Sequence, residues 1–210
     1  MKKILLVISV FALFSCKSKE EKAAELIKDE MFKVLFDFES YQPIETKIDS
    51  AFCSAYTDSA ILKHGYLMNE LLKETDIKLE EVKDAQHSMG IWGIDPYSSL
   101  DVLRYNEAKE KADKCIKELD SYINLINAES DTIQQLAQNI KPTFWGWKAT
   151  HKFRCKNKGG DPSIGNWVYY FDEKMKRVVY NEDTEDEDLI KVKGLIKEAL
   201  DKMQKKEASN

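Results

Sequence analysis

The chain has 210 residues, of which 43% are hydrophobic and 33% are charged, and its formal net charge is -5. This composition excludes a protein with several membrane spans and a Pro/Gly-rich disordered polymer, and the acidic balance argues against a nucleic-acid partner. The length suits one compact domain, or a helical body with a small appended domain.

The N-terminus predicts an export signal. Lys2 and Lys3 precede a run at 4–14 that is apolar except for Ser9. A helix of this length would span about 16 Å, roughly half of the hydrocarbon core of a bilayer, so it is too short to be a membrane anchor. A short basic start before such a run is typical of a secretory signal peptide, which is removed after export. We assign residues 1–15 to this signal.

A lipid-attachment motif follows the apolar run. The tetrapeptide Leu13-Phe14-Ser15-Cys16 resembles the lipobox of bacterial lipoproteins, which has Leu three residues before the Cys and a small residue directly before it. The resemblance implies that Cys16 is the lipid-attachment residue and becomes the first residue of the mature chain. It also implies acylation, for example by palmitate. Because two or three acyl chains hold a protein stably, the membrane becomes a partner through the N-terminal lipid.

The residues after Cys16 bear on localisation. Residues 16–22 are polar and are expected to form a short tether. Lys17 stands where lipoproteins that are retained in the inner membrane carry Asp, so the resemblance implies the outer membrane. Lys19-Glu20-Glu21 is similar to the export signal of surface lipoproteins in Bacteroidetes-type bacteria. We expect a lipid-anchored cell-envelope protein, with the periplasmic and the surface face both open.

Helical periodicity dominates the next part of the chain, and we expect a helical body over 23–140. Apolar residues recur at helical spacing from Glu20 to about Ser40, where Pro43 ends the helix. A second helical pattern runs from Ile48 and fades near Ala85. A third runs from Leu100 to Ile140 with spacings that alternate between three and four. This alternation predicts antiparallel helices with coiled-coil-like packing.

The period changes from helical to two after Pro142. Aromatic and apolar residues alternate with Gly, Thr and four basic residues from Trp145 to Lys156, and two further strands are expected at 166–172 and 177–181. A last helix should begin at a capping box at Thr184. The predicted fold class is α+β and mostly helical: a long antiparallel helical bundle, a three-stranded antiparallel meander and a C-terminal helix. Residues 141–210 would form the small β-meander plus helix region.

Several segments carry a further resemblance. They resemble parts of uncharacterised envelope lipoproteins of the Bacteroidetes type, a likeness that supports localisation and implies no activity. The segments are 36–44, Asp49-Ser50, 144–148 and 151–157.

Motifs for catalysis or metal binding are not recognisable. The sequence has no His-x3-His, Cys-x2-Cys or His-Glu-x2-His spacing, no Gly-x-Ser-x-Gly elbow and no Gly-rich phosphate loop. We therefore predict no metal, no cofactor and no assignable catalytic residue. Cys53, Cys115 and Cys155 are expected to be unpaired and mostly buried. With Cys53 on the second helix, its level along the hairpin would differ from that of Cys115 by about 30 Å, far beyond disulfide reach.

Two surfaces are candidates for contact with a partner. The segment from Lys141 to Asn181 carries nine Lys and Arg against three acids, and a solvated strand face there could attract an anionic partner. Its members are Lys148, Lys152, Arg154 and Lys156. The alternative is a merely solubilising face. The second candidate is an apolar hairpin tip with Ile91, Trp92 and Ile94, which is either packed or exposed to a partner.

The sequence thus favours a lipid-anchored binding or structural module of the cell envelope. Its partner would be an envelope protein or an anionic glycan. The alternative is an envelope-associated hydrolase whose catalytic residues are dispersed and unassigned. An aromatic-lined cleft with clustered acids would favour the hydrolase, whereas a surface without convergent titratable groups would favour the binding module.

Overall fold

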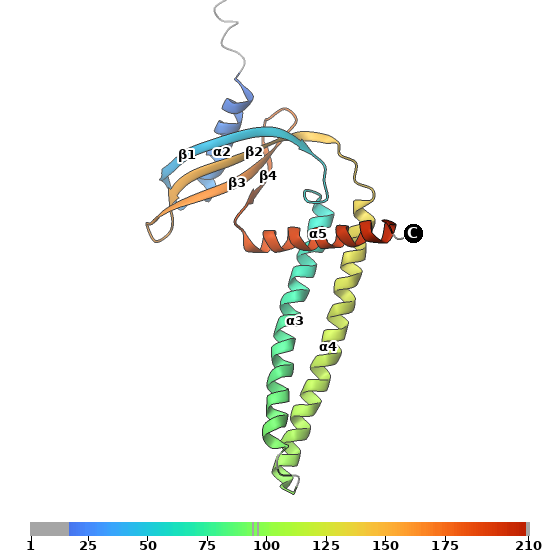
Figure 1. Cartoon of the computed structure of the whole chain (residues 1–210). Helices are drawn as coiled ribbons and strands as arrows, with labels where there is room; N and C mark the ends of the chain where they lie inside the picture. Colours follow the sequence, from blue (N-terminus) through green and yellow to red (C-terminus); the bar gives the residue numbers. More distant parts are fainter. Residues whose placement is uncertain (1–16, 94, 96, 209–210) are drawn as a thin grey trace, which may run out of the picture. The chain divides into compact units, whose positions relative to one another are not determined.

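A computed structural model describes residues 17–208 except 94 and 96. These residues form four helices and one four-stranded sheet, and they divide into two compact units (Figure 1). The sheet unit comprises the described part of Met1–Cys53 together with Pro142–Asp186. The helical unit comprises Ser54–Lys141 and the described part of Glu187–Asn210. The α+β, mostly helical fold class is confirmed, with four strands in place of the expected three.

The first helix of the sheet unit, α2 (Lys19–Val34), begins directly after a capping box. The Ser18 hydroxyl accepts from the Glu21 backbone N–H, and the Glu21 carboxylate accepts from the Ser18 N–H. Residues 19–22, which were expected to belong to a tether, are therefore helical, because the box satisfies N–H groups that a helix start leaves unpaired. The buried face of α2 consists of Ala23, Ile27 and Met31, each 0% exposed.

The sheet is antiparallel with the strand order β1-β2-β3-β4. Its strands are β1 (Asp37–Phe52), β2 (Phe144–Lys156), β3 (Pro162–Asp172) and β4 (Val178–Asp183). One face packs against α2 and forms a core that joins the buried face of the helix to five sheet-unit residues. These are Ala149, Phe153, Tyr169, Phe171 and Met175.

The expectation of a helical body over 23–140 is wrong for residues 37–52, which form strand β1. The sequence interpretation divided this segment between the end of one helix and the start of the next, but it pairs with β2 along its length. Its β-branched residues Ile44, Thr46 and Ile48 stand at period two, which suits a strand. Pro43 is tolerated because β1 is an edge strand, where a missing backbone N–H costs little.

Strand β2 contains a bulge at Trp145. Ala51 pairs with Gly146 and Phe52 pairs with Phe144, so Trp145 is the extra residue. A Cβ on Gly146 would lie 2.0 Å from the carbonyl oxygen of Phe171. Only glycine permits this close approach of the two backbones.

The helical unit contains an antiparallel hairpin of two long helices, α3 (Ser59–Trp92) and α4 (Ser99–Ala137), as the heptad-like spacing predicted (Figure 1). Asp58 caps α3 and Ser98 caps α4 through their side-chain oxygens. Midway along the hairpin a small core forms from Val82, Cys115 and Leu119.

The last helix, α5 (Glu187–Ala208), packs across α3 and α4 and belongs to the helical unit. Val192 and Ile196, each 0% exposed, share a core with Ile61 and Ile133. Close packing depends on Gly65, where a Cβ would lie 2.8 Å from Cγ1 of Val192. The expected grouping of this helix with the meander in 141–210 therefore differs from the structure, because its apolar stripe matches the hairpin.

The predicted capping box at Thr184 is wrong. The Thr184 hydroxyl donates to the carbonyl of Asn166 at 2.6 Å, so it fixes the end of β4 to β3. The helix begins three residues later, at Glu187.

Candidate functional site

The four basic residues singled out in the sequence lie on β2. Lys152, Arg154 and Lys156 are exposed and Lys148 is half-exposed, while Ala149, His151 and Phe153 between them are buried. The alternation places the two sets on opposite faces of the strand. The structure thus brings the basic residues together on the face that does not contribute to the α2 core.

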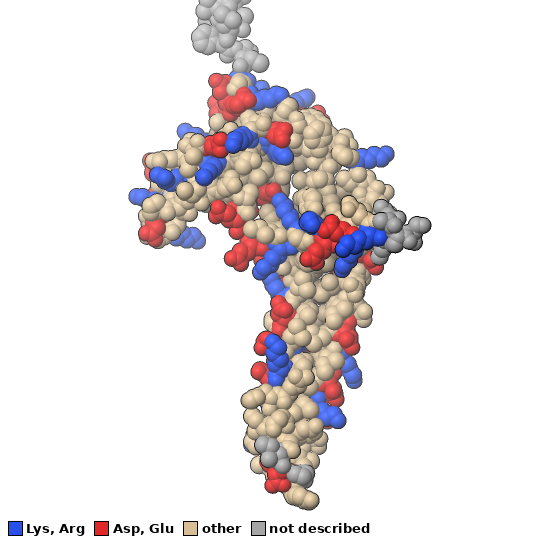
Figure 2. All heavy atoms as spheres, viewed as in Figure 1, with Lys and Arg blue, Asp and Glu red and all other residues tan. Residues whose placement is uncertain are grey.

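Acidic residues of β1 oppose most of this basic face. Asp37 pairs with Lys156 and Glu45 with Lys152 in the strand register, and Asp49 opposes Lys148. The Asp49 carboxylate lies 3.8 Å from Nζ of Lys148. On the visible surface in Figure 2, basic and acidic groups are likewise interspersed over the sheet unit. The face is therefore a mixed-charge surface, which is a weaker attractor for anions than the sequence suggested.

Arg154 departs from this pattern. It lies opposite Gln42 on β1 and Ile164 on β3, and its guanidinium is exposed. A guanidinium can hold a carboxylate or a phosphate by two parallel hydrogen bonds. Among the four basic residues of β2, Arg154 is the strongest candidate for contact with an anionic group.

The opposite face of β2 holds a buried polar cluster that sequence reasoning missed. His151 is 2% exposed, and each ring nitrogen meets a hydroxyl of β1. Its Nε2 lies 2.8 Å from the Tyr41 hydroxyl, and its Nδ1 lies 2.8 Å from the Thr46 hydroxyl. The imidazole also stacks on Phe153, with ring centroids 5.6 Å apart. The signal was present in the sequence, since His151 occupies an apolar position of an alternating strand.

Burial keeps the groups of this cluster uncharged. It lowers the pKa of His151 to about 4 and raises the pKa of Tyr41 to about 12. The pKa of the Tyr169 phenol is also raised, first of all by burial. A neutral imidazole between two hydroxyls is a structural hydrogen-bond hub, because one nitrogen donates and the other accepts.

The Tyr169 hydroxyl, unlike the polar groups of His151, lacks a hydrogen-bond partner among the described residues. It is buried. The Tyr169 and His151 rings meet edge to face, with centroids 6.2 Å apart.

The apolar hairpin tip is partly covered. Ile91 is 46% exposed, whereas Trp92 is half-buried beneath the Arg104 guanidinium, whose central carbon lies 4.3 Å from the centroid of the indole ring. Ile94 lies outside the described residues. Tyr97, near the start of α4, is 96% exposed. The tip therefore offers apolar side chains, but its tryptophan already has a cationic partner.

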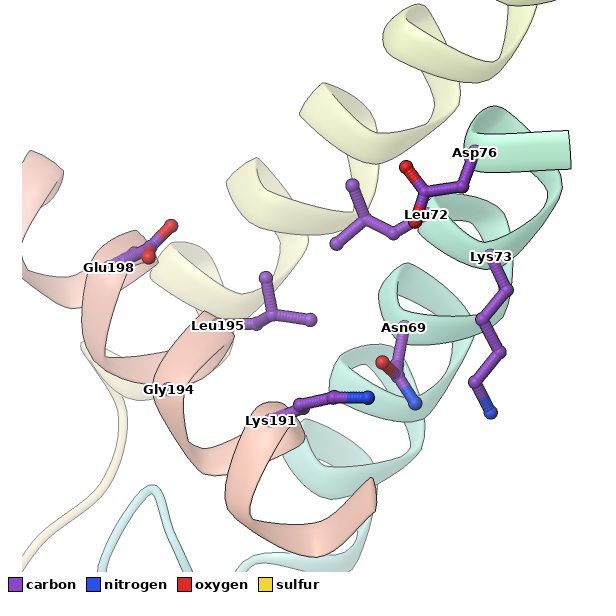
Figure 3. A pocket seen from close by; sticks show the side chains of 8 residues that line it. All are labelled: Asn69, Leu72, Lys73, Asp76, Lys191, Gly194, Leu195 and Glu198. Atoms are coloured by element: carbon purple, nitrogen blue, oxygen red, sulfur yellow. The ribbon is translucent and has the colours of Figure 1, made fainter. Parts of the chain in front are cut away.

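A groove of about 440 Å³ lies between α3 and α5, within the helical unit (Figure 3). Leu72 and Leu195 form its apolar part, and a Cβ on Gly194 would meet nothing within 4 Å. Two lysines and two acids line the groove beside Asn69: Lys73, Lys191, Asp76 and Glu198.

The polar groups at one end of the groove are already paired. The Asn69 amide donates to one carboxylate oxygen of Asp188 at 3.1 Å, and Nζ of Lys73 donates to the other at 3.2 Å. Hydrogen bonds from Lys73 and Asn69 lower the pKa of Asp188. These bonds tie the first turn of α5 to α3, so this end of the groove has a structural role.

The three cysteines that the structure describes are free thiols, but only one of them is buried, so the expectation of mostly buried thiols is wrong. Cys53 is exposed, Cys155 is half-buried and Cys115 is buried. The expected placement of Cys53 on a helix is wrong, because it follows the last residue of β1. The Cys115 thiol donates to the Glu81 carboxylate at 3.2 Å, which raises the pKa of the thiol. A protonated thiol of this kind is a poor nucleophile.

Among residues 17–208, gaps aside, no group of three or more His, Cys, Asp or Glu side chains could hold a metal ion. The helices that the structure describes include none long and apolar enough to cross a membrane. Comparison with protein families, curated proteins and solved structures found no match to the chain.

Proposed function

We propose that the chain is a lipid-anchored protein of the cell envelope that acts as a binding or structural module. The sequence Leu13-Phe14-Ser15-Cys16 supports the anchor. The structural observation that supports a module held close to the membrane is the position of α2. This helix begins at Lys19, and its buried face belongs to the core of the sheet unit.

The packing of α2 sets the length of the connection. Only Lys17 and Ser18 stand between Cys16 and the first helical residue, and two extended residues span roughly 7 Å. Lipid on Cys16 would therefore hold the sheet unit near the headgroups without a long flexible linker. Such an arrangement suits a module that presents a surface to a neighbouring envelope molecule.

The candidate contact surface is the exposed part of the basic strand face around Arg154. Arg154 and its neighbours Lys152 and Lys156 are exposed side chains on a rigid strand. A partner with carboxylate or phosphate groups, such as an anionic glycan or an acidic envelope protein, fits this chemistry. The mixed charge around it favours a local contact over general attraction to polyanions.

The anchor is tested by replacing Cys16 with Ala in the full chain. The variant should remain an unprocessed, unlipidated precursor, because the thiol that forms the thioether is lost. The measurements are incorporation of labelled palmitate and partition into the detergent phase.

Cys53→Ala is the matched control, because it removes a different thiol, one that is exposed in the sheet unit. The control should incorporate label and partition as the natural chain does. Equal labelling of the Cys16→Ala variant would overturn the proposed anchor.

A further inference from the structure

Strand β1 presents an edge without a strand partner in the part of the chain that the structure describes. It is the first strand of the sheet order and pairs only with β2 (Figure 1). From Glu45 to Ala51 this pairing has no irregularity. A regular edge of this length offers a row of backbone N–H and C=O groups that another strand can pair with.

The sequence of this edge is complementary to itself. An antiparallel strand pair between two identical chains has a two-fold axis, so residues equally spaced on either side of the axis oppose each other. With the axis at Ile48, Lys47 of each chain opposes Asp49 of the other. The same register sets Thr46 opposite Ser50 and Ile44 opposite Phe52.

We propose that β1 binds β1 of a second copy of this chain, antiparallel and centred on Ile48, so that the two sheets become one continuous sheet. This inference does not depend on the lipid anchor, and it names a partner at a different surface from the basic face. It rests on three observations about β1, which concern charge, apolar exposure and regularity.

Charge is the first observation. Glu45, Lys47 and Asp49 follow one another at period two and therefore lie on one face of β1. Within the chain, Nζ of Lys47 lies 2.9 Å from the Glu45 carboxylate, and both side chains are mostly exposed. An exposed pair of this kind contributes little. The Lys47 ammonium can therefore turn to Asp49 of the second copy, and two such pairs form around the axis.

Apolar exposure is the second observation. Ile44 and Phe52 are each 50% exposed, although both belong to β1. In the register centred on Ile48, Ile44 of each chain lies opposite Phe52 of the other chain, so one such pair forms at each end of the paired segment. Cross-strand aromatic and β-branched pairs are among those that stabilise sheets.

Regularity is the third observation, and it selects the register. The irregular pairings with β2 lie at or beyond the two ends of the proposed segment, around Gln42, Pro43 and Glu45 and between Ala51 and Phe52. A register centred on Thr46 would also oppose Lys47 to Glu45, but it would bring Pro43, which has no N–H, into the new ladder. The axis at Ile48 leaves Pro43 outside.

Disulfide trapping tests the register. In the full chain with Cys53→Ser, an Ile48→Cys substitution places the two new thiols directly opposite each other. Opposed residues of antiparallel strands have Cα atoms about 4.5–5.5 Å apart, within disulfide range. Oxidation with copper phenanthroline should give covalent dimers in at least about fivefold higher yield than Val179→Cys, an exposed position on the other edge strand.

Charge reversal tests the interface in a chain that keeps Ile48. Lys47→Glu should weaken the dimer by about tenfold or more, because two attractions become two repulsions. Adding Asp49→Lys should restore self-association, because opposite charges again face each other. This double variant should not pair with the natural chain. Lys174→Glu, with the same change in net charge in the turn between β3 and β4, is the control.

The readout is molar mass by light scattering over a range of protein concentrations. A monomer at every concentration, or equal dimer fractions for Lys47→Glu and Lys174→Glu, would overturn the proposal. So would cross-linking of Ile48→Cys that does not exceed that of Val179→Cys. None of these outcomes bears on palmitate labelling of Cys16, so the two proposals can fail separately.

Discussion

The Tyr41 hydroxyl lies 2.8 Å from Nε2 of His151, although 110 residues separate them in the chain. This contact joins the first and second strands of the sheet beneath α2. With Thr46 on the other ring nitrogen, it gives the buried imidazole two hydrogen-bond partners, and burial keeps the imidazole neutral by lowering its pKa. The stability of the sheet unit should therefore depend on pH through one residue.

The first prediction concerns pH. The pKa of His151 is about 4 in the folded chain and 6.5 for a solvent-exposed histidine, so between these values the unfolded state binds one more proton than the folded state. The stability that the folded chain has while His151 is neutral in both states is fully present above pH 6.5 and is lost as the pH falls toward 4. The free energy of unfolding should therefore be about 2 kcal/mol lower at pH 5 than at pH 7.

Urea denaturation at both pH values, followed by tryptophan fluorescence, measures this difference. Tyr41 and Tyr169 stay protonated throughout, because burial raises their pKa. His151→Gln should lose most of the pH dependence, whereas His87→Gln, at an exposed histidine, should keep it. Equal pH dependence in both variants would contradict the assignment to His151.

The second prediction compares the buried Tyr169 with the half-buried Tyr41. Tyr169→Phe removes a hydroxyl that has no partner among the described residues, so it should leave stability unchanged or raise it by about 1 kcal/mol. Tyr41→Phe removes a partner of His151 and should cost about 1–2 kcal/mol. Urea denaturation at pH 7 measures both. A larger loss for Tyr169→Phe than for Tyr41→Phe would be inconsistent with this account.

The third prediction concerns the basic strand face. Replacing Lys148, Lys152 and Lys156 with Gln should shift the melting temperature by less than about 3 °C, because exposed charges contribute little to stability. Elution from a heparin column, a polyanionic probe, should move to lower salt. The matched control replaces three exposed lysines of α4: Lys109, Lys111 and Lys117.

The control should elute closer to the natural chain, although it loses the same charge. If both triple variants elute alike, net charge rather than the strand face governs the contact. A fall of many degrees in the melting temperature would mean that the basic face is part of the core.

The fourth prediction concerns Trp92 and Arg104 at the hairpin tip. Because Trp92 is half-buried, Trp92→Ala should cost about 1–2 kcal/mol, less than the roughly 3–5 kcal/mol of a fully buried tryptophan. A double-mutant cycle with Arg104→Ala should give a coupling of about 0.5–1 kcal/mol. A coupling near zero would show that the guanidinium does not stabilise the indole.

Much of the fold could be predicted from residue periodicity. The spacing of apolar residues gave the hairpin of α3 and α4, and the alternation around Trp145–Lys156 gave β2, since each pattern covers many residues. The grouping of α5 with α3 could not be predicted, because the close approach at Gly65 depends on which helix lies above it.

Strand β1 and its histidine cluster were missed for a related reason. Between Phe38 and Phe52 the apolar residues are few, so Phe38 and Ile48 could be assigned to helical patterns on either side. The strand is recognised only once β2 pairs with it, as the register of Thr46 with His151 shows. The site was missed together with the strand that supplies its two hydroxyls.

The sheet unit is built from two stretches of chain with the whole α3–α4 hairpin between them. The backbone N–H of Cys53 donates to the carbonyl of Thr143 at 2.9 Å, where the chain leaves and re-enters the sheet unit. During synthesis β1 must therefore wait for the entire hairpin to emerge before β2 can pair with it, and closing so long a loop is slow. The hairpin has mostly local contacts and can form first. The delay leaves β1 without its partner strand until late, which would suit the export across a membrane that we propose.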